Sequence, residues 1–304
     1  MKILLIGRNG QVGWELRRSL SALGEVIAPE RSELDLGDVA SIRRAVRGIK
    51  PSLVVNAAAY TEVDKAESEA ALAFRINADA PAVLAEETKR VGAGLVHYST
   101  DYVFDGAKHD PYVEEDAPNP LNVYGRSKLA GEVAVRAIAR DYLILRTSWV
   151  YAQRGRNFLL TMLRLAQDGA ILRIVADQRG APTYSRTIAD ATAHLITCLR
   201  NSASATDESS WRHSGLYHLS CMGSTSWCGF ARSIFALSRA ADSTWELMLE
   251  EISTSDYGAA AARPLNSGLS NDKLKKTFDI SLPRWDHALE LCMEDLQGRS
   301  GLSR

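Results

Sequence analysis

Short apolar runs alternate with longer amphipathic stretches through the first half of the 304-residue chain. Compact apolar runs bounded by small or polar residues predict buried strands. They occupy the ranges 2–7, 25–29, 52–59, 94–100 and 142–151. Between them, apolar residues recur at a spacing of three and four, which predicts helices at 13–23, 38–49, 70–91 and 128–139.

This order of elements predicts the fold class. Strands that alternate with helices at this spacing favour an α/β fold, with a doubly wound parallel sheet of the Rossmann type covered on both faces. Asp38 suits the N-cap of the second helix. Pro81 is expected to interrupt the third. The second half is less regular, and the polar stretch 201–215 is expected to be an exposed loop.

Composition narrows the class of protein. The chain is 46% hydrophobic with a formal net charge of −1, so it can form a sizeable core and shows no basic patch for nucleic acid. No apolar run approaches the ~18–20 residues that cross a bilayer. "MKILLIG" at the N-terminus is typical of a buried strand and not of a signal peptide, so a cytoplasmic location is expected. The cysteines have no metal-binding spacing and are interpreted as isolated buried thiols: Cys198, Cys221, Cys228 and Cys292.

A glycine motif follows the first predicted strand and opens the first helix. In "GRNGQVG", a glycine recurs every third residue, which lets the chain turn sharply and lets a pyrophosphate approach the backbone. The start of the helix adds unpaired N–H groups and partial positive charge. We therefore expect a dinucleotide cofactor to bind at Gly7, Asn9, Gly10, Gln11, Val12 and Gly13.

The second strand is followed by residues of both charges. Glu30 lies where a carboxylate would bind the adenosine ribose 2′-hydroxyl, which favours NADH. Arg31 and Arg8 could instead meet a 2′-phosphate, which favours NADPH, so the choice of cofactor stays open. Further cofactor contacts are expected at Asp35, Leu36, Ala57, Ala58 and Ala59, although "LDL" also suits a plain loop and the alanines suit tight packing.

Polar residues at the fourth predicted strand and the next helix suggest the chemistry. Thr100 ends the strand, and Tyr124 and Lys128 follow one helical turn apart. A ketone that accepts a hydride becomes an alkoxide and needs a proton, which a tyrosine can donate. A nearby lysine would lower the tyrosine pKa from about 10. With this Thr–Tyr–Lys order behind a nucleotide fold, the chain resembles the extended short-chain dehydrogenase/reductase superfamily.

The resemblance extends to one branch of that superfamily. The chain is similar to the dTDP-4-dehydrorhamnose reductases in the order of "GQVGWEL", "NAAAYTEVDKAE", "HYSTDYVFDG", "PLNVYGRSKLAGE", "RTSWVY", "DQRGAPT" and "RPLNSGL". The resemblance implies an NAD(P)H-dependent enzyme that reduces the 4-keto group of a dTDP-linked 4-keto-6-deoxysugar, dTDP-4-dehydro-L-rhamnose, to give dTDP-L-rhamnose for polysaccharide synthesis. A reductase of another nucleotide-linked 4-ketosugar and a non-catalytic regulatory subunit remain alternatives.

The resemblance also implies residue roles. Tyr124 would donate the proton, Lys128 would tune it and hold the nicotinamide ribose, and Thr100 would position the substrate. Asp101 and Trp149 would contact the sugar, and Arg263 the diphosphate, whose oxygens suit a guanidinium. Thr61 and Tyr98 are expected to contact the cofactor, and Val63 the substrate.

Two organisational expectations complete the picture. A dinucleotide-binding domain is expected over 1–147, rejoined by about 184–215, with a smaller α/β substrate-binding domain over 148–183 and 216–304. In some relatives, glutamates bind magnesium between two subunits. Glu15 matches one of them, but Arg186 occupies another position, so we expect no metal here. An Arg186–Glu15 pair would preserve a homodimer without metal, and the oligomeric state stays open.

Overall fold

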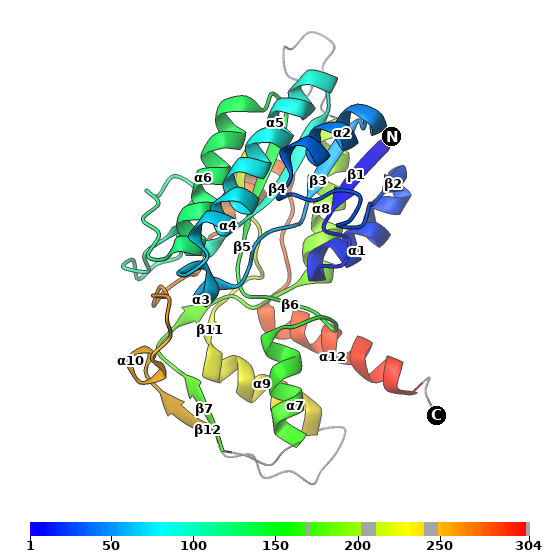
Figure 1. Cartoon of the computed structure of the whole chain (residues 1–304). Coiled ribbons are helices and arrows are strands. Elements are labelled where there is room, and N and C mark those ends of the chain that lie inside the picture. Colours follow the sequence, from blue (N-terminus) through cyan, green and yellow to red (C-terminus); the bar gives the residue numbers. More distant parts are fainter. Residues whose placement is uncertain (168–170, 202–210, 240–248, 302–304) are drawn as a thin grey trace.

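A computed structural model describes residues 1–167, 171–201, 211–239 and 249–301. Within these ranges, six parallel strands form the central sheet, in the order β10–β5–β4–β3–β1–β2 (Figure 1). The strands are β1 (Lys2–Ile6), β2 (Glu25–Ile27), β3 (Leu53–Asn56), β4 (Gly94–Thr100), β5 (Tyr142–Thr147) and β10 (Gly215–His218). This sheet confirms the predicted fold class.

Helices cover both faces of the sheet because alternate strand residues point in opposite directions. Ile3 and Leu5 of β1 belong to a core shared with α1 (Gln11–Ser19), α8 (Ser185–Asn201) and α11 (Asp272–Phe278). Leu4 and Ile6 pack on the other face, against α2 (Val39–Ile49), α5 (Ala80–Val91) and α6 (Val123–Ile138). Tyr124 lies on α6.

The helix start predicted at Asp38 is confirmed, whereas the break predicted at Pro81 lies a few residues earlier. The Asp38 side chain accepts a hydrogen bond from the Ala40 N–H at 2.9 Å, which confirms the predicted N-cap of α2. Pro81 lies in the first turn of α5, where proline is tolerated. The irregularity lies just before it, in a π-helical turn (Arg75–Asp79) that follows α4 (Ala70–Phe74).

The strand predicted over 142–151 was too long. β5 ends at Thr147, and a short strand β6 (Val150–Tyr151) follows in a separate two-stranded sheet with β9 (Thr183–Tyr184). The extended conformation of the chain is interrupted at Trp149, whose φ is +46°. A bulky residue rarely adopts this conformation, so an apolar sequence run gives no warning of it.

The remaining elements pack below the sheet in Figure 1 around a core of their own, which includes Tyr151, Ile174, Phe230 and Leu289. This core is separate from the cores of the sheet, and the division into two domains stays a proposal together with its boundaries. Residues 202–210 of the expected exposed loop lie outside the described ranges. The elements are α7 (Phe158–Gln167), β7 (Leu172–Val175), β8 (Arg179–Gly180), β11 (Thr225–Ser226), α9 (Trp227–Arg239), β12 (Leu249–Ile252), α10 (Thr254–Tyr257) and α12 (Trp285–Gly301).

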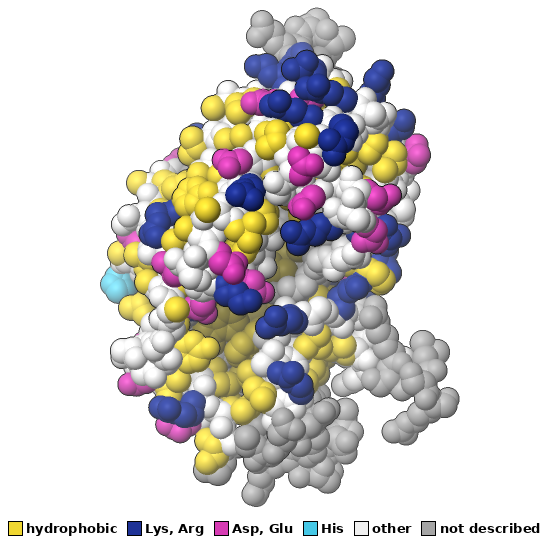
Figure 2. All heavy atoms as spheres, in the orientation of Figure 1, with side chains coloured by type: hydrophobic (Ala, Val, Ile, Leu, Met, Phe, Trp, Pro, Cys, Tyr) yellow, Lys and Arg dark blue, Asp and Glu magenta, His cyan; other side chains and the backbone are white. Residues whose placement is uncertain are grey.

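The sheet topology marks where a ligand belongs. β1 lies between β2 and β3, so the connection from β1 leads to one side of it in the sheet, and the next strand, β3, lies on its other side. Such a switch point opens a crevice at the carboxyl ends of the strands. Figure 2 shows a hollow with apolar atoms on its floor between the upper and lower parts of the molecule. None of the helices in the described ranges has the length and hydropathy that a bilayer-spanning segment requires.

Candidate active site

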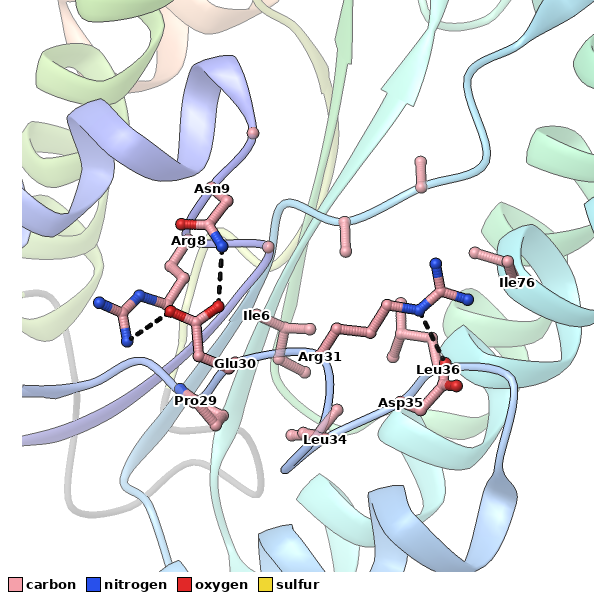
Figure 3. A pocket seen from close by; sticks show the side chains of 14 residues that line it. Ile6, Arg8, Asn9, Pro29, Glu30, Arg31, Leu34, Asp35, Leu36 and Ile76 are labelled. Atoms are coloured by element: carbon pink, nitrogen blue, oxygen red, sulfur yellow. Dashed lines mark hydrogen bonds and ion pairs between the residues drawn. The ribbon is translucent and has the colours of Figure 1, made fainter. Parts of the chain in front are cut away.

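A pocket lies at the carboxyl ends of β1, β2 and β3, at the switch point of the sheet (Figure 3). Gly7 has a φ of +91°, and a Cβ there would lie 2.7 Å from the Ala58 nitrogen, so only glycine fits the turn. Gly10 is the N-cap of α1 and offers no side chain to cap it. The first-turn N–H groups of α1 are therefore available to an anion such as a cofactor pyrophosphate. The pocket is lined by Ile6, Gly7, Arg8, Asn9, Gly10, Pro29, Glu30, Arg31, Leu34, Asp35, Leu36, Ala58, Ala59 and Ile76.

The charged side chains of this pocket form ion pairs with one another. Glu30 lies between Arg8, whose Nη1 is 3.4 Å from its Oε1, and Asn9, which donates to its Oε2 at 2.8 Å. Arg31 lies 3.6 Å from Asp35 between Nε and Oδ1, as Figure 3 shows. Both the carboxylate suited to a ribose hydroxyl and the guanidinium groups suited to a phosphate are present, so a dinucleotide of either kind fits.

Buried polar groups in β3 and β4 hold the loop that follows β3. Asn56 accepts from the Ala58 N–H at 3.2 Å, so its Nδ2 faces the His97 ring at 3.2 Å. Burial lowers the pKa of His97 well below its usual range, and His97 is a packed strand residue. Farther along, Thr61 is exposed, and Val63 is half-buried at the start of α3 (Val63–Ala66). Of the residues in "NAAAYT", Ala58 and Ala59 line the same pocket as the glycine loop, whereas Thr61 is not among its lining residues.

Thr100 and Tyr124 meet at the carboxyl edge of the sheet. Thr100 is the last residue of β4, and Tyr124 lies in the first turn of α6, which the Asn122 side chain caps by accepting from the Gly125 N–H at 2.7 Å. Burial raises the Tyr124 pKa to about 12, and the nearby Thr100 hydroxyl offsets part of this rise. Tyr124 therefore holds its proton at neutral pH, as a proton donor must.

Lys128 lies one turn farther along α6 and is fully buried. Its Nζ donates to the Tyr98 carbonyl oxygen at 2.6 Å, and burial lowers its pKa to about 8. The Tyr98 side chain points into the core, where its hydroxyl bonds to Thr192 at 2.7 Å. Any cofactor contact of Tyr98 is therefore left to its main chain.

Asp101 is more enclosed than a sugar-binding residue is expected to be. Its Oδ1 accepts from the Thr100 hydroxyl at 3.0 Å, and its Oδ2 accepts from Ser148 at 2.9 Å. Burial raises the Asp101 pKa to about 6, and the hydrogen bonds from Ser148 and Thr100 offset only part of this rise. A group with these partners acts first on the orientation of Thr100.

Arg263 is already paired in this structure. Its Nη2 lies 2.7 Å from Asp64 Oδ2, and its Nη1 donates to Asp64 Oδ1 at 3.1 Å. Asp64 belongs to α3 and also accepts from the Ala261 N–H at 3.0 Å. A substrate diphosphate at Arg263 would share the guanidinium with this carboxylate.

Three buried polar residues that were not predicted from the sequence help to position α6. Asn77, in the π-helical turn, bonds to both main-chain groups of Tyr60 and donates to Ser127 of α6 at 3.0 Å. Glu132 of α6 accepts two hydrogen bonds from Arg146 of β5, at 2.8 and 2.7 Å. A lone charged residue in an apolar run is the signal that could have found Glu132 and Arg146, whereas Asn77 lies between Arg75 and Asp79 and has no such signal.

Arg186, at the position where the resemblance implied a metal-binding glutamate in relatives, has its Nη1 2.9 Å from Asp295 Oδ2 on α12. Within one chain Arg186 therefore pairs with Asp295, and a pair with Glu15 across a homodimer stays a prediction. Across the described ranges, no cluster of three or more His, Cys, Asp or Glu side chains is suited to a metal ion.

Known proteins resemble this chain over nearly its whole length. A family model described as "RmlD substrate binding domain" matches residues 1–298. The dTDP-4-dehydrorhamnose reductase of Burkholderia thailandensis is 53% identical over 300 residues, which cover 97% of this chain and 99% of that protein. The Salmonella typhimurium enzyme of the same name is 44% identical over 301 residues, with 97% and 98% covered. The crystal structure of dTDP-4-dehydrorhamnose reductase from Bacillus anthracis in complex with NADP matches with a TM-score of 0.88 at 35% identity, covering 97% of this chain and 100% of that one.

Proposed function

Because the chain belongs to the dTDP-4-dehydrorhamnose reductase family, we propose that it reduces the 4-keto group of dTDP-4-dehydro-L-rhamnose to give dTDP-L-rhamnose. The hydride comes from NADPH or NADH, bound over the glycine loop of β1 and α1. The closeness of Thr100 and Tyr124 at the carboxyl edge of the sheet carries the proposal, since these are the two groups that a substrate ketone would meet.

Tyr124 is the proton donor in this proposal. Its raised pKa keeps the hydroxyl protonated, so it can neutralise the alkoxide that forms at C4. The phenolate left behind is costly in a buried site, and the ammonium of Lys128 is the cation that would stabilise it. The structure shows Lys128 bonded to the Tyr98 carbonyl, so its tuning of Tyr124 and its contact with the ribose stay proposals.

Thr100 positions the ketone oxygen. In this structure the Thr100 hydroxyl donates a hydrogen bond to Asp101. To position the substrate, Thr100 would donate this hydrogen bond to the ketone oxygen and no longer to the carboxylate. Trp149 contacts the sugar, and Arg263 the diphosphate, in exchange for part of its pairing with Asp64. The dTDP-linked substrate, a homodimer and a cytoplasmic location belong to the proposal.

The purified chain, NADPH and dTDP-4-dehydro-L-rhamnose test this function together. Loss of NADPH absorbance should depend on the ketosugar nucleotide, and dTDP-L-rhamnose should be the product. A reductase of another nucleotide-linked 4-ketosugar would oxidise NADPH only with that sugar. A regulatory subunit would bind NADPH without turnover of any ketosugar, and that result would overturn the proposal.

A further inference from the structure

Two tryptophans are stacked where the lower part of the molecule meets the sheet. The rings of Trp149 and Trp227 lie 3.6 Å apart between centroids, with an angle of 4° between their planes. Trp149 follows β5 by two residues, and Trp227 is the first residue of α9. The stack therefore joins the carboxyl edge of the sheet to the second core.

Trp149 is held in an unfavourable backbone conformation. Its φ is +46°, and its side chain is almost fully buried. Such a conformation in a bulky residue persists only where the surroundings over-determine it, and it concentrates at ligand sites. Its neighbour Ser148 bonds to Asp101, so a change at Trp149 lies close to the catalytic threonine.

Gly180 supports the indole from a second direction. A Cβ on Gly180 would lie 2.5 Å from Cε2 and 2.6 Å from Nε1 of Trp149, so the ring occupies the space of the missing side chain. The Trp149 ring thus rests between a main-chain surface and the face of Trp227.

Trp227 is itself fixed, which makes it a firm support. Its Nε1 donates to Gln178 Oε1 at 3.2 Å, and Gln178 donates in turn to Thr254 at 3.1 Å. Phe158 of α7 packs against its ring, with centroids 4.7 Å apart. Three elements outside the sheet therefore determine where the Trp227 face lies.

We propose that Trp227 is a positioning residue for substrate binding, which acts by holding the Trp149 indole at the sugar end of the cleft. Trp227 need not touch the substrate. The inference rests on the proposed role of Trp149 as a sugar contact, and it adds that this contact is set by a residue of α9. A pre-ordered indole lowers the ordering cost of binding, so its release weakens substrate affinity more than the chemical step.

The test compares Trp227→Leu, Trp227→Phe and Trp149→Phe with a control, Trp285→Leu, which removes a buried tryptophan of the same core. Steady-state kinetics give KM for the ketosugar nucleotide and kcat, and titration gives the NADPH Kd. Near-ultraviolet circular dichroism reports the coupled signal of two parallel indoles. Trp227→Met replaces Trp227→Leu if the leucine variant does not fold.

Trp227→Leu should raise KM about tenfold, with kcat and the NADPH Kd within about twofold of the parent, and should abolish the coupled indole signal. Trp227→Phe keeps a flat ring and should restore most of the affinity, whereas Trp285→Leu should lower the melting temperature and leave KM unchanged. An unchanged KM in Trp227→Leu beside a raised KM in Trp149→Phe would overturn the inference alone. An unchanged KM in Trp149→Phe would show that Trp149 does not contact the sugar, and the inference about Trp227 would then fail as well. A KM raised equally by Trp285→Leu would reduce Trp227 to a general packing residue.

Discussion

Arg263 and Asp64 form a two-point ion pair across the cleft, with nitrogen–oxygen distances of 2.7 and 3.1 Å. Asp64 follows the third strand of the sheet, and Arg263 belongs to a segment 199 residues later. The pairing lowers the Asp64 pKa, so the carboxylate stays charged at neutral pH. The guanidinium is therefore oriented before substrate arrives.

Replacing Arg263 should weaken substrate binding. Arg263→Gln removes a charge-assisted contact to the diphosphate, and KM for the ketosugar nucleotide should rise about tenfold or more, with little change in the NADPH Kd. Asp64→Asn is the matched variant, because it breaks the same ion pair but leaves the arginine in place. If both variants raise KM equally, Arg263 serves the closure of the cleft and not the diphosphate.

Tyr124→Phe isolates the proton donor, since it removes the hydroxyl and keeps the ring. Turnover should fall by about 10²-fold or more, the usual cost of a lost general acid. The NADPH Kd, measured by fluorescence titration, should stay the same. Tyr102→Phe is a suitable control, because Tyr102 packs edge-on against Tyr124 at 6.1 Å between centroids. Near-normal turnover in Tyr124→Phe would refute the assignment.

Glu30 should set the balance between the two cofactors. The carboxylate now lies between Arg8 and Asn9, so Glu30→Ala frees a guanidinium and removes repulsion of a 2′-phosphate. The ratio of kcat/KM for NADPH to that for NADH should rise several-fold. Glu25→Ala removes the same charge from an exposed position on β2 outside the pocket and should leave the ratio unchanged. A ratio that does not move in Glu30→Ala would mean that Glu30 lies away from the ribose.

Asp101 should make stability depend on pH in an unusual direction. Burial raises its pKa to about 6, so the folded state binds a proton more tightly than the unfolded state does. Its favourable contribution is complete below pH ~4 and is lost as the pH rises to about 6, a change on the order of 2–3 kcal/mol. Urea unfolding of Asp101→Asn at pH 4 to 7 should show a flatter profile than the parent.

The control for that experiment is Asp105→Asn. Hydrogen bonds from Ala107, Asn119 and Tyr112 lower the pKa of Asp105, so its contribution is present at neutral pH and is lost as the pH falls. That loss falls below pH ~4, so between pH 4 and 7 Asp105→Asn should leave the slope of the parent profile nearly unchanged. Equal slopes for both variants would contradict the burial argument.

Magnesium should have no effect on this protein. Arg186 stands where the resemblance implies a metal-binding glutamate, and it pairs with Asp295 at 2.9 Å. An arginine offers only donors and a positive charge, which a hard cation does not bind. Activity and light-scattering mass should be the same after dialysis against EDTA and after addition of excess magnesium. A mass or rate that follows the metal would defeat this prediction.

The sequence predicted features that depend on neighbours along the chain. The Asp38 cap, the sheet strands and the placement of Tyr124 and Lys128 one turn apart on one helix follow from local spacing. Such signals need no knowledge of the fold.

Features fixed by distant partners could not be predicted in the same way. Trp149 has a φ of +46° and stacks on Trp227, which lies in another element of the chain, so neither feature has a local sequence signal. Arg263 was predicted to bind phosphate, and its ion pair with Asp64 has no local signature. The buried charges of Glu132 and Arg146 were visible in apolar runs, but only the fold shows that they meet.

The late position of β10 affects how the protein is made. β10 pairs with β5, from Gly215 beside Leu143 to His218 beside Arg146, yet the chain between them builds part of the second core. During translation, β5 is therefore an open sheet edge until more than two-thirds of the chain has left the ribosome. Such an edge is a template for pairing with other chains. A fragment that ends at Thr147 would keep this edge exposed, so a cofactor-binding domain cut there is expected to aggregate where the full chain does not.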